Sequence, residues 1–188
     1  SVGLRSFSLF RCDRNWEETG KTRGGGVCVF INKRWCVNQV VLHSSCSDHL
    51  EILCVQCRPF YLPREINCII IMVVYIQPGG NKNLALEEIT QMATDYETAK
   101  PTAAIVILGD FNGGKLDIPL FHQFVECSTR GTNTLDLCYC NKVNAYKSKQ
   151  RLALGASDHN MIYLQPTYVQ KIKSEKAITK LKRNWNQE

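Results

Sequence analysis

An unbroken apolar run of nine residues, from Cys68 to Ile76, is the feature that most constrains what this chain can fold into. The run is rich in β-branched residues and contains no charge, so it predicts a central β-strand that is buried on both faces. The turn-forming residues 77–80, Gln-Pro-Gly-Gly, end it. Because a transmembrane helix needs roughly 18 or more apolar residues, the run is too short to span a bilayer, and we expect no association with a membrane.

After this strand the apolar pattern changes from a strand period to a helical one. From residue 84 to residue 99 the apolar positions are spaced as on one face of an α-helix, at Ala85, Ile89, Met92 and Tyr96. Pro101 ends the predicted helix, and residues 103–108 form a second buried strand. That strand places Gly109-Asp110-Phe111-Asn112 at its carboxyl end, where catalytic groups often lie in sheets of this kind.

The remaining elements are shorter. The predicted strands are residues 26–32, which follow the glycine run 24–26, and residues 51–57, 135–139 and 161–164; a short helix is predicted at 118–125 and a loop at 142–156. The class is therefore α/β (α+β), with a core that consists mainly of sheet. A chain of 188 residues that is 44% hydrophobic has room for one sizeable core, so we expect a single domain.

The positions of the cysteines and of the charged residues indicate the redox compartment of the protein and what its tail could bind. Most of the 10 cysteines lie inside apolar strand segments, which indicates free, buried thiols in a reducing compartment. Cys54 and Cys57 have a zinc-like spacing, but residues three apart on a strand point to opposite faces, which argues against a zinc site. The net charge is +6, and residues 166–188 contribute +4 of it, with six Lys/Arg and two Glu. This basic tail fits either phosphate binding or a solvated linker.

Two short motifs carry candidate chemistry. Asp110 could orient or deprotonate an attacking water, and Asn112 could hold that water or a phosphoryl oxygen. An Asx-turn explains the same residues equally well. In Ser157-Asp158-His159, the carboxylate could bind a divalent cation and the imidazole could contact a phosphate oxygen. A second copy of this tripeptide, at residues 47–49, shows that three letters alone do not decide its role.

Other catalytic classes lack their sequence patterns. The chain has no Gly-x-Ser-x-Gly elbow for a serine hydrolase, and it has no Walker A or dinucleotide-binding fingerprint.

The order of the motifs is more specific than any one of them. Taken together, the series resembles the endonuclease/exonuclease/phosphatase superfamily, and within it the apurinic-type endonuclease domain of non-long-terminal-repeat retrotransposons. The segment from Cys57 to Glu65 and the Trp35-Cys36 pair resemble elements of fish genomes. The motifs of the series are residues 23–27 (Arg-Gly-Gly-Gly-Val), 74–78 (Val-Tyr-Ile-Gln-Pro), 107–112 (Ile-Leu-Gly-Asp-Phe-Asn), 129–136 with Thr129, Arg130 and Asp136, and 157–159.

This resemblance implies a two-sheet β-sandwich flanked by helices, of the DNase I-like four-layer type, and roles for individual residues. Asp110 would be the general base, Asn112 would position the nucleophile, and His159, oriented by Asp136, would hydrogen-bond the scissile phosphate. Tyr75 would donate its phenol to the phosphate, and Asp158 would bind Mg²⁺ or Mn²⁺. Thr129 and Ser157 would contact the substrate, which would be DNA.

The resemblance also implies a wider context. The family's first strands, which carry a catalytic Asn and a metal-binding Glu, have no counterpart, and we carry that Glu role over to none of Glu17, Glu18 and Glu51. We therefore expect a domain at residues 1–168 that is truncated at its N-terminus. A basic tail or linker at 169–188 would lead toward a reverse transcriptase, and the protein would be intracellular and act in the nucleus.

Three functions fit these expectations. The leading one is a metal-dependent endonuclease domain that nicks DNA for retrotransposon insertion. The second is a catalytically silent or decayed nucleic-acid-binding domain, which the missing Glu favours. The third is a phosphatase of the same superfamily.

Overall fold

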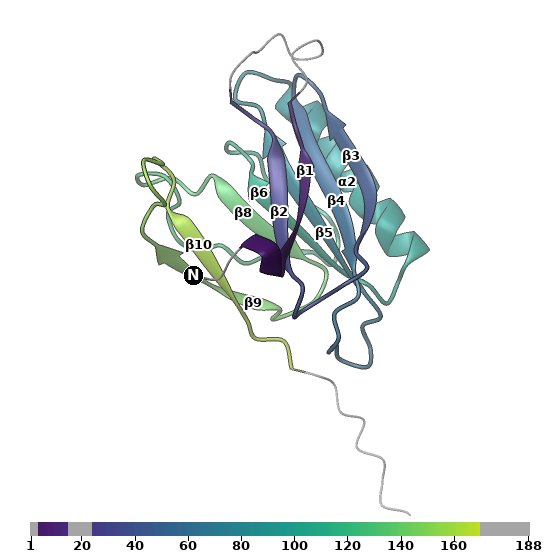
Figure 1. The fold of residues 1–188 in the computed structure, drawn as a ribbon. Helices are drawn as coiled ribbons and strands as arrows, with labels where there is room; N and C mark the ends of the chain where they lie inside the picture. The colour runs from purple at the N-terminus through teal and green to yellow at the C-terminus, as the bar shows by residue number, and fades with distance from the viewer. Residues whose placement is uncertain (1–3, 15–23, 170–188) are drawn as a thin grey trace, which may run out of the picture.

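The computed structural model describes residues 4–14 and 24–169, and its centre is a six-stranded mixed sheet with the strand order β3-β4-β5-β6-β8-β7 (Figure 1). Its strands are β3 (Val40–Cys46), β4 (Leu50–Cys57), β5 (Ile69–Ile76), β6 (Ala104–Asp110), β7 (His122–Gln123) and β8 (Asp136–Cys140). Only β5 and β6 pair in parallel; the other neighbours are antiparallel. The predicted sheet-rich core is confirmed.

The connection between β5 and β6 is the helix α2 (Lys82–Ala99), which covers one face of the sheet. The side chain of Asn81 caps the helix by accepting a hydrogen bond from the backbone N–H of Leu84, so the helix begins two residues before the predicted start. Its buried residues, Ala85, Ile89 and Ala93, pack against the apolar side chains of that sheet face. The predicted helix and both flanking strands are confirmed.

Two small antiparallel sheets lie on the other face of the large sheet. One pairs β1 (Phe7–Cys12) with β2 (Val27–Asn32), and the other pairs β9 (Tyr146–Arg151) with β10 (Met161–Pro166). Each buries its own apolar cluster against the large sheet: the first packs over β4 and β5, and the second over β6 and β8. The result is the predicted β-sandwich, with α2 as the long helix that flanks it in the described ranges.

Several sequence-based predictions of secondary structure were wrong. Residues 118–125 form turns and the two-residue strand β7 instead of a helix, because Pro119 lies near the start and Leu120 has φ +69°. The predicted loop at 142–156 contains strand β9, which the pattern did not reveal because most of its side chains are polar and exposed. Strands β1 and β3 were missed as well. They lie at sheet edges and are only partly buried, so they lack a continuous apolar run.

The prediction that most of the cysteines are buried and form no disulfide is confirmed. None of the ten cysteines, all of which lie in the described residues, is in a disulfide, and seven of them are buried. Cys54 packs on the α2 side of the large sheet and Cys57 on the opposite side, so the two thiols do not converge. Burial raises the pKa of both thiols to about 12, which keeps them protonated and unreactive at neutral pH. None of the described helices is long and apolar enough to cross a membrane.

The register of the large sheet places four polar side chains in one row. Glu51 pairs with Tyr75, Tyr75 pairs with Asp110, and Asp110 pairs with Asp136, on the successive strands β4, β5, β6 and β8. All four lie on the sheet face that is turned away from α2, because their neighbours at alternate positions pack there. This row leads directly to the candidate site.

Candidate active site

Asp110, the last residue of β6, is half-buried and fixed by a tight turn. Its Oδ1 accepts a hydrogen bond from the backbone N–H of Asn112 at 2.9 Å. Asn112 has φ +45°, and its Nδ2 donates to the backbone oxygen of Ile76 at 2.7 Å. The Asx-turn that competed with the catalytic interpretation is therefore present. The two interpretations are compatible, because the turn holds the carboxylate at the end of the strand.

Asp136 and His159 complete a cluster with Asp110. His159 Nδ1 lies 2.8 Å from Asp136 Oδ2, which assigns the Nδ1 proton to this hydrogen bond and leaves Nε2 as the nitrogen that can meet a ligand. One ligand atom from each of the three residues lies within 4.8 Å of the others. Sequence reasoning predicted this His-carboxylate pair across 23 residues, and the geometry brings it together.

The electrostatics of the cluster favour a positive partner. Burial raises the pKa of Asp110, and the negative charge of Asp136 raises it further, whereas the hydrogen bond from Asn112 lowers it. Two carboxylates beside each other repel, and a cation between them relieves that repulsion. Mg²⁺ and Mn²⁺ bind in proteins through one or two carboxylates together with waters and substrate phosphates. Asp110 and Asp136 therefore form a donor set that fits a hydrated divalent cation.

Tyr75 lies between this cluster and a buried ion pair. Glu51, on β4, is fully buried, and its carboxylate accepts hydrogen bonds from Arg14 and from the backbone N–H of Gly26, both at 2.5 Å. The guanidinium of Arg14 lies 5.7 Å from the centre of the Tyr75 ring, within cation–π range. The ion pair thus supports the tyrosine from the side opposite Asp110.

Sequence reasoning did not identify Glu51 and Arg14 as members of this network. One signal was available: Glu51 is the only charged residue in a strand that is buried at every position, and a buried carboxylate requires a partner. The glycine run is part of the same arrangement. Gly24, Gly25 and Gly26 all have positive φ, between +72° and +88°, which directs the Gly26 N–H at Glu51.

Three predicted site residues lie outside the cluster. Asp158 forms an ion pair with Arg130, Nη2 to Oδ2 2.6 Å, and both side chains are more than half exposed. Ser157 Oγ accepts a hydrogen bond from the backbone N–H of His159, so it shapes the loop that carries the histidine. Thr129 is fully buried.

The burial of Thr129 does not fit a direct contact with DNA. Its Oγ1 accepts from the backbone N–H groups of Leu135 and Asp136, at 2.9 and 3.1 Å. We therefore assign Thr129 to holding the start of β8, and through it Asp136, in place.

The second Ser-Asp-His tripeptide has a structural position. His49 is buried on the α2 side of the sheet, with Nδ1 2.6 Å from Asp48 and Nε2 3.0 Å from Glu88 of the helix. Burial by itself lowers the pKa of His49, but the two carboxylates outweigh it, and the net shift is upward. This histidine links the β3–β4 turn to α2.

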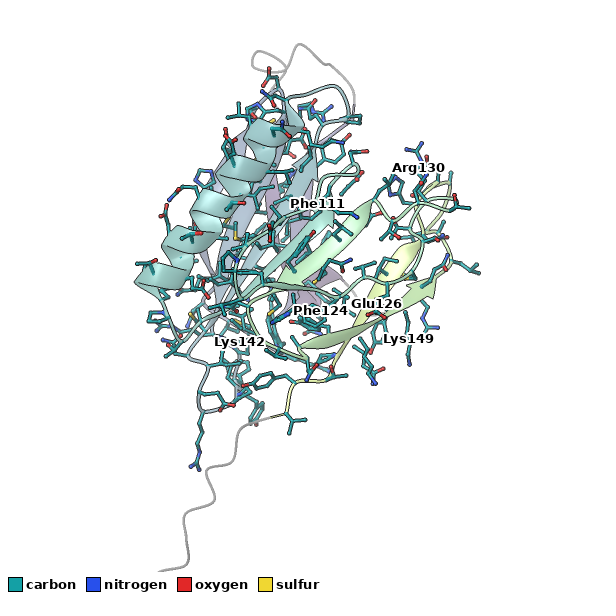
Figure 2. The ribbon with its side chains drawn as sticks, turned by 180° about the vertical axis from the view of Figure 1, so that it is seen from behind. Phe111, Phe124, Glu126, Arg130, Lys142 and Lys149 are labelled. Atoms are coloured by element: carbon teal, nitrogen blue, oxygen red, sulfur yellow. The ribbon has the colours of Figure 1, made fainter. Side chains whose placement is uncertain are left out.

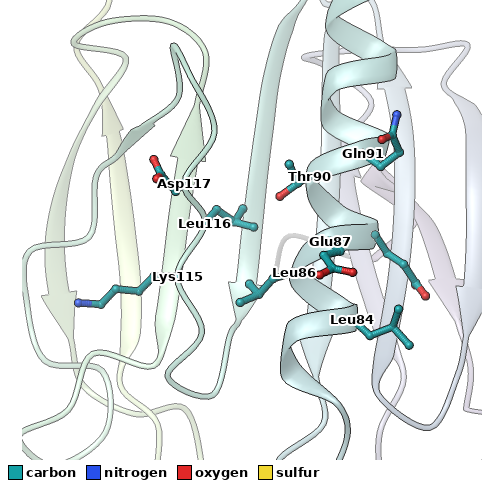
Figure 3. A pocket seen from close by; sticks show the side chains of 9 residues that line it. Leu84, Leu86, Glu87, Thr90, Gln91, Lys115, Leu116 and Asp117 are labelled. Carbon is teal, nitrogen blue, oxygen red and sulfur yellow. The ribbon is translucent and has the colours of Figure 1, made fainter.

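A hollow in the surface lies apart from the cluster. It runs between α2 and the loop 115–117, and its lining includes Leu84, Glu87, Gln91 and Lys115 (Figure 3). This hollow is on the α2 face of the sheet, whereas Asp110 and Asp136 face the other way. The cluster at the carboxyl end of β6, whose three residues are partly exposed, therefore does not share this hollow.

Comparison with known proteins supports the fold. No family model and no curated protein matches the sequence. Among solved structures, the chain is similar to the endonuclease domain of TRAS1, a telomere-specific non-LTR retrotransposon, with 15% identity, a TM-score of 0.57 and coverage of 84% of this chain and 77% of that one.

Two further structures give the same result. Danio rerio TDP2, solved in complex with a single-strand DNA product, has 12% identity, a TM-score of 0.57 and coverage of 85% and 76%. An endonuclease/exonuclease/phosphatase family protein from Bacteroides thetaiotaomicron has 13% identity, a TM-score of 0.54 and coverage of 86% and 75%. At these identities the likeness shows the fold alone, and the expected DNase I-like fold is confirmed.

Proposed function

We propose that this chain is a metal-dependent phosphodiesterase domain that nicks DNA. The observation that carries the proposal is the convergence of Asp110, Asp136 and His159 at the end of β6 and β8. The proposal is supported by the fold, which the TRAS1 endonuclease domain and TDP2 share, and by the complex of TDP2 with a single-strand DNA product.

Each residue of the site has its own role in the proposed hydrolysis. The raised pKa of Asp110 makes its carboxylate a stronger base than that of an ordinary aspartate. Asp110 takes the proton of a water that attacks phosphorus. His159, as the imidazolium, donates from Nε2 to a non-bridging phosphate oxygen, and Asp136 accepts from Nδ1 and holds the ring in the orientation that this requires. Tyr75 and Asn112 border the same strand ends and position the phosphate and the water.

The proposed cofactor is Mg²⁺, with Mn²⁺ as an alternative. Asp110 and Asp136 would hold the ion, which would neutralise the charge that develops on the phosphate. Asp158 is a further candidate ligand, which would first have to leave its ion pair with Arg130.

The test is nicking of supercoiled plasmid by the 188-residue chain in Mg²⁺. We expect conversion to the open circular form, and loss of that conversion in Asp110→Ala and His159→Ala. Asp95→Ala and His43→Ala, which remove the same side chains far from the cluster, are the matched controls and should nick as the unmodified chain does. If both site variants nick at the unmodified rate, the assignment of the site is wrong.

A second candidate is a DNA-binding domain without turnover. It is favoured by the small number of carboxylates in the cluster, because the described residues bring only Asp110 and Asp136 to it, and a site with few carboxylates holds Mg²⁺ weakly. Salt-sensitive DNA binding in the absence of any Mg²⁺-dependent nick would support this candidate over the first.

The sequence resemblance to non-long-terminal-repeat retrotransposons extends the proposal. In that setting the nick would leave a 3′-hydroxyl that primes a reverse transcriptase, and the site of action would be the nucleus.

A further inference from the structure

Strand β9 carries a row of positive side chains on one face. Lys147, Lys149 and Arg151 occupy alternate positions of the strand, and all three are exposed. The intervening Tyr146 and Ser148 are partly buried and point toward the sandwich. Because side chains alternate across a strand, the three cations share the outward face at intervals of about 6.6 Å. We refer to these three residues as the β9 cation row.

The neighbouring strand adds an aromatic ring to this face. In the antiparallel register, Met161, Tyr163 and Gln165 of β10 stand opposite Arg151, Lys149 and Lys147, respectively. The Arg151 guanidinium lies 5.8 Å from the centre of the Tyr163 ring, which is itself 48% exposed. A guanidinium that stacks on an exposed ring is held in place while its N–H groups remain available to an anion.

The row leads to the candidate active site. Arg151 is its last member, and the loop that follows carries Asp158 and His159 before β10 begins. Arg130 pairs with Asp158 of that loop and neutralises its charge, so this acid does not offset the row. In Figure 2, Lys149 lies on the outer strand of the small sheet, and Arg130 lies farther along the same side of the molecule.

The charges around the row are mostly positive. The exposed acid nearest to it is Glu126, whose backbone N–H donates to Ser148 Oγ on β9. Asp158 is the other acid on this side, and Arg130 neutralises it. Three cations therefore face solvent together with the acid Glu126, over a length of about 13 Å.

We propose that the β9 cation row binds the phosphate backbone of duplex DNA that flanks the nicked bond. The inference rests on the proposed function for the identity of the ligand, but the contacts lie outside the reacting cluster. Lysine and arginine that neutralise phosphates release counterions, so such a row contributes affinity without reading sequence. A DNA strand held along β9 would place a phosphodiester at the loop that ends in His159.

A purely structural role exists for the same residues. Charged side chains on a strand that lacks a second neighbour prevent edge-to-edge aggregation, and β9 pairs only with β10 in the described residues. Edge protection predicts that loss of the charges changes solubility and leaves the affinity for DNA unchanged. The two roles are therefore separable by measurement.

The experiment measures binding of a fluorescent DNA duplex to the full chain by anisotropy, in EDTA so that no turnover occurs. The test variant is Lys147→Gln, Lys149→Gln, Arg151→Gln, which keeps long polar side chains. The control variant is Arg34→Gln, Arg58→Gln, Arg64→Gln, which removes the same charge from exposed positions in loops outside this face. A second control, Lys147→Arg, Lys149→Arg, Arg151→Lys, keeps the charge of the row and should retain the affinity.

We expect the test variant to bind at least about tenfold more weakly at about 50 mM salt, and the slope of log affinity against log salt to fall by about 2.7, or 0.9 for each lost phosphate contact. The control variant Arg34→Gln, Arg58→Gln, Arg64→Gln should lose less of the slope than the test variant does. Equal affinity and slope in the test variant and the unmodified chain would overturn the proposal.

Parallel plasmid-nicking assays separate this inference from the proposed function. If the unmodified chain nicks DNA and the test variant binds DNA as tightly as the unmodified chain, the inference is refuted and the proposed function is not. If the test variant binds DNA more weakly but the unmodified chain never nicks, the inference is supported and the proposed catalysis is refuted. A chain that binds no DNA would overturn both.

Discussion

Gly109→Ala tests the register that brings Asp110 to the site. Gly109 lies in β6 directly opposite Val74 of the parallel neighbour β5, with φ +144°. A Cβ atom built on it would lie 1.9 Å from the backbone oxygen of Val74 and 2.9 Å from its carbonyl carbon. Because these are backbone atoms between two central strands, no side-chain rotation relieves the contact.

The size of the effect follows from this geometry. Real Cβ contacts are essentially never shorter than 3.0 Å, so the two strands would have to separate by 3.0 − 1.9 = 1.1 Å at this point. Such a shift would weaken about two backbone hydrogen bonds, and each buried donor or acceptor left unpaired costs about 1–3 kcal/mol. The positive φ adds about 1 kcal/mol for a residue with a side chain. We expect a loss of roughly 3–7 kcal/mol, a large part of the 5–15 kcal/mol that is typical of a folded domain.

The measurement is urea unfolding followed by circular dichroism, with the free energy of unfolding extrapolated to water. Gly79→Ala is the matched control, because the same added methyl group would meet no atom within 4 Å and the φ of Gly79 is not in the left-handed region. The control should unfold within about 0.5 kcal/mol of the unmodified chain. A Gly109→Ala protein that is destabilised by less than about 1 kcal/mol would refute the β5–β6 register and the placement of Asp110 that depends on it.

Three other predictions concern titratable residues. Burial raises the pKa of Asp110 in the metal-free protein, so in EDTA its carboxyl group should titrate above the ordinary value of 3.8 when followed by NMR; a titration at or below that value would contradict the assigned environment. Asp136→Asn should reduce nicking roughly 10- to 100-fold and leave thermal stability nearly unchanged, because it weakens the orientation of His159. Single-turnover rates with saturating DNA measure this effect. An unchanged rate would argue against the positioning role of Asp136. The pKa of His49 is raised in the fold, so its ion pairs stabilise the protein fully below pH 6.5 and the contribution is lost as pH rises through the folded pKa. The difference in unfolding free energy between the unmodified chain and His49→Gln should therefore be largest in acid and shrink in alkali, and a difference that grows with pH would show that the contact with Glu88 is not an ion pair.

The sequence determined the parts of this protein that depend on local pattern. The apolar run that becomes β5 and the helical spacing of α2 are signals that lie within one element, and both are found where expected. The turn at 109–112 is local as well, since Asp110 and Asn112 are two residues apart and their hydrogen bond requires nothing distant. Strand β9 was not predicted from the sequence because most of its side chains are polar and exposed. A strand with few buried residues lacks the alternation of apolar and polar residues that identifies a strand.

The tertiary structure alone decided which of these residues meet. Two copies of Ser-Asp-His are indistinguishable as letters, yet one places its histidine beside Asp136 and the other places it beside Glu88 on the opposite face of the sheet. The row that runs from Glu51 through Tyr75 to Asp110 and Asp136 exists because four strands pair in one register, which is set by packing between segments as far apart as 85 residues, from 51 to 136. Asp158, the expected metal ligand, instead pairs with Arg130, because an exposed carboxylate takes the cation that the fold brings to it. Sequence patterns specify elements and turns, whereas the geometry of a site depends on contacts between distant segments, which no short motif encodes.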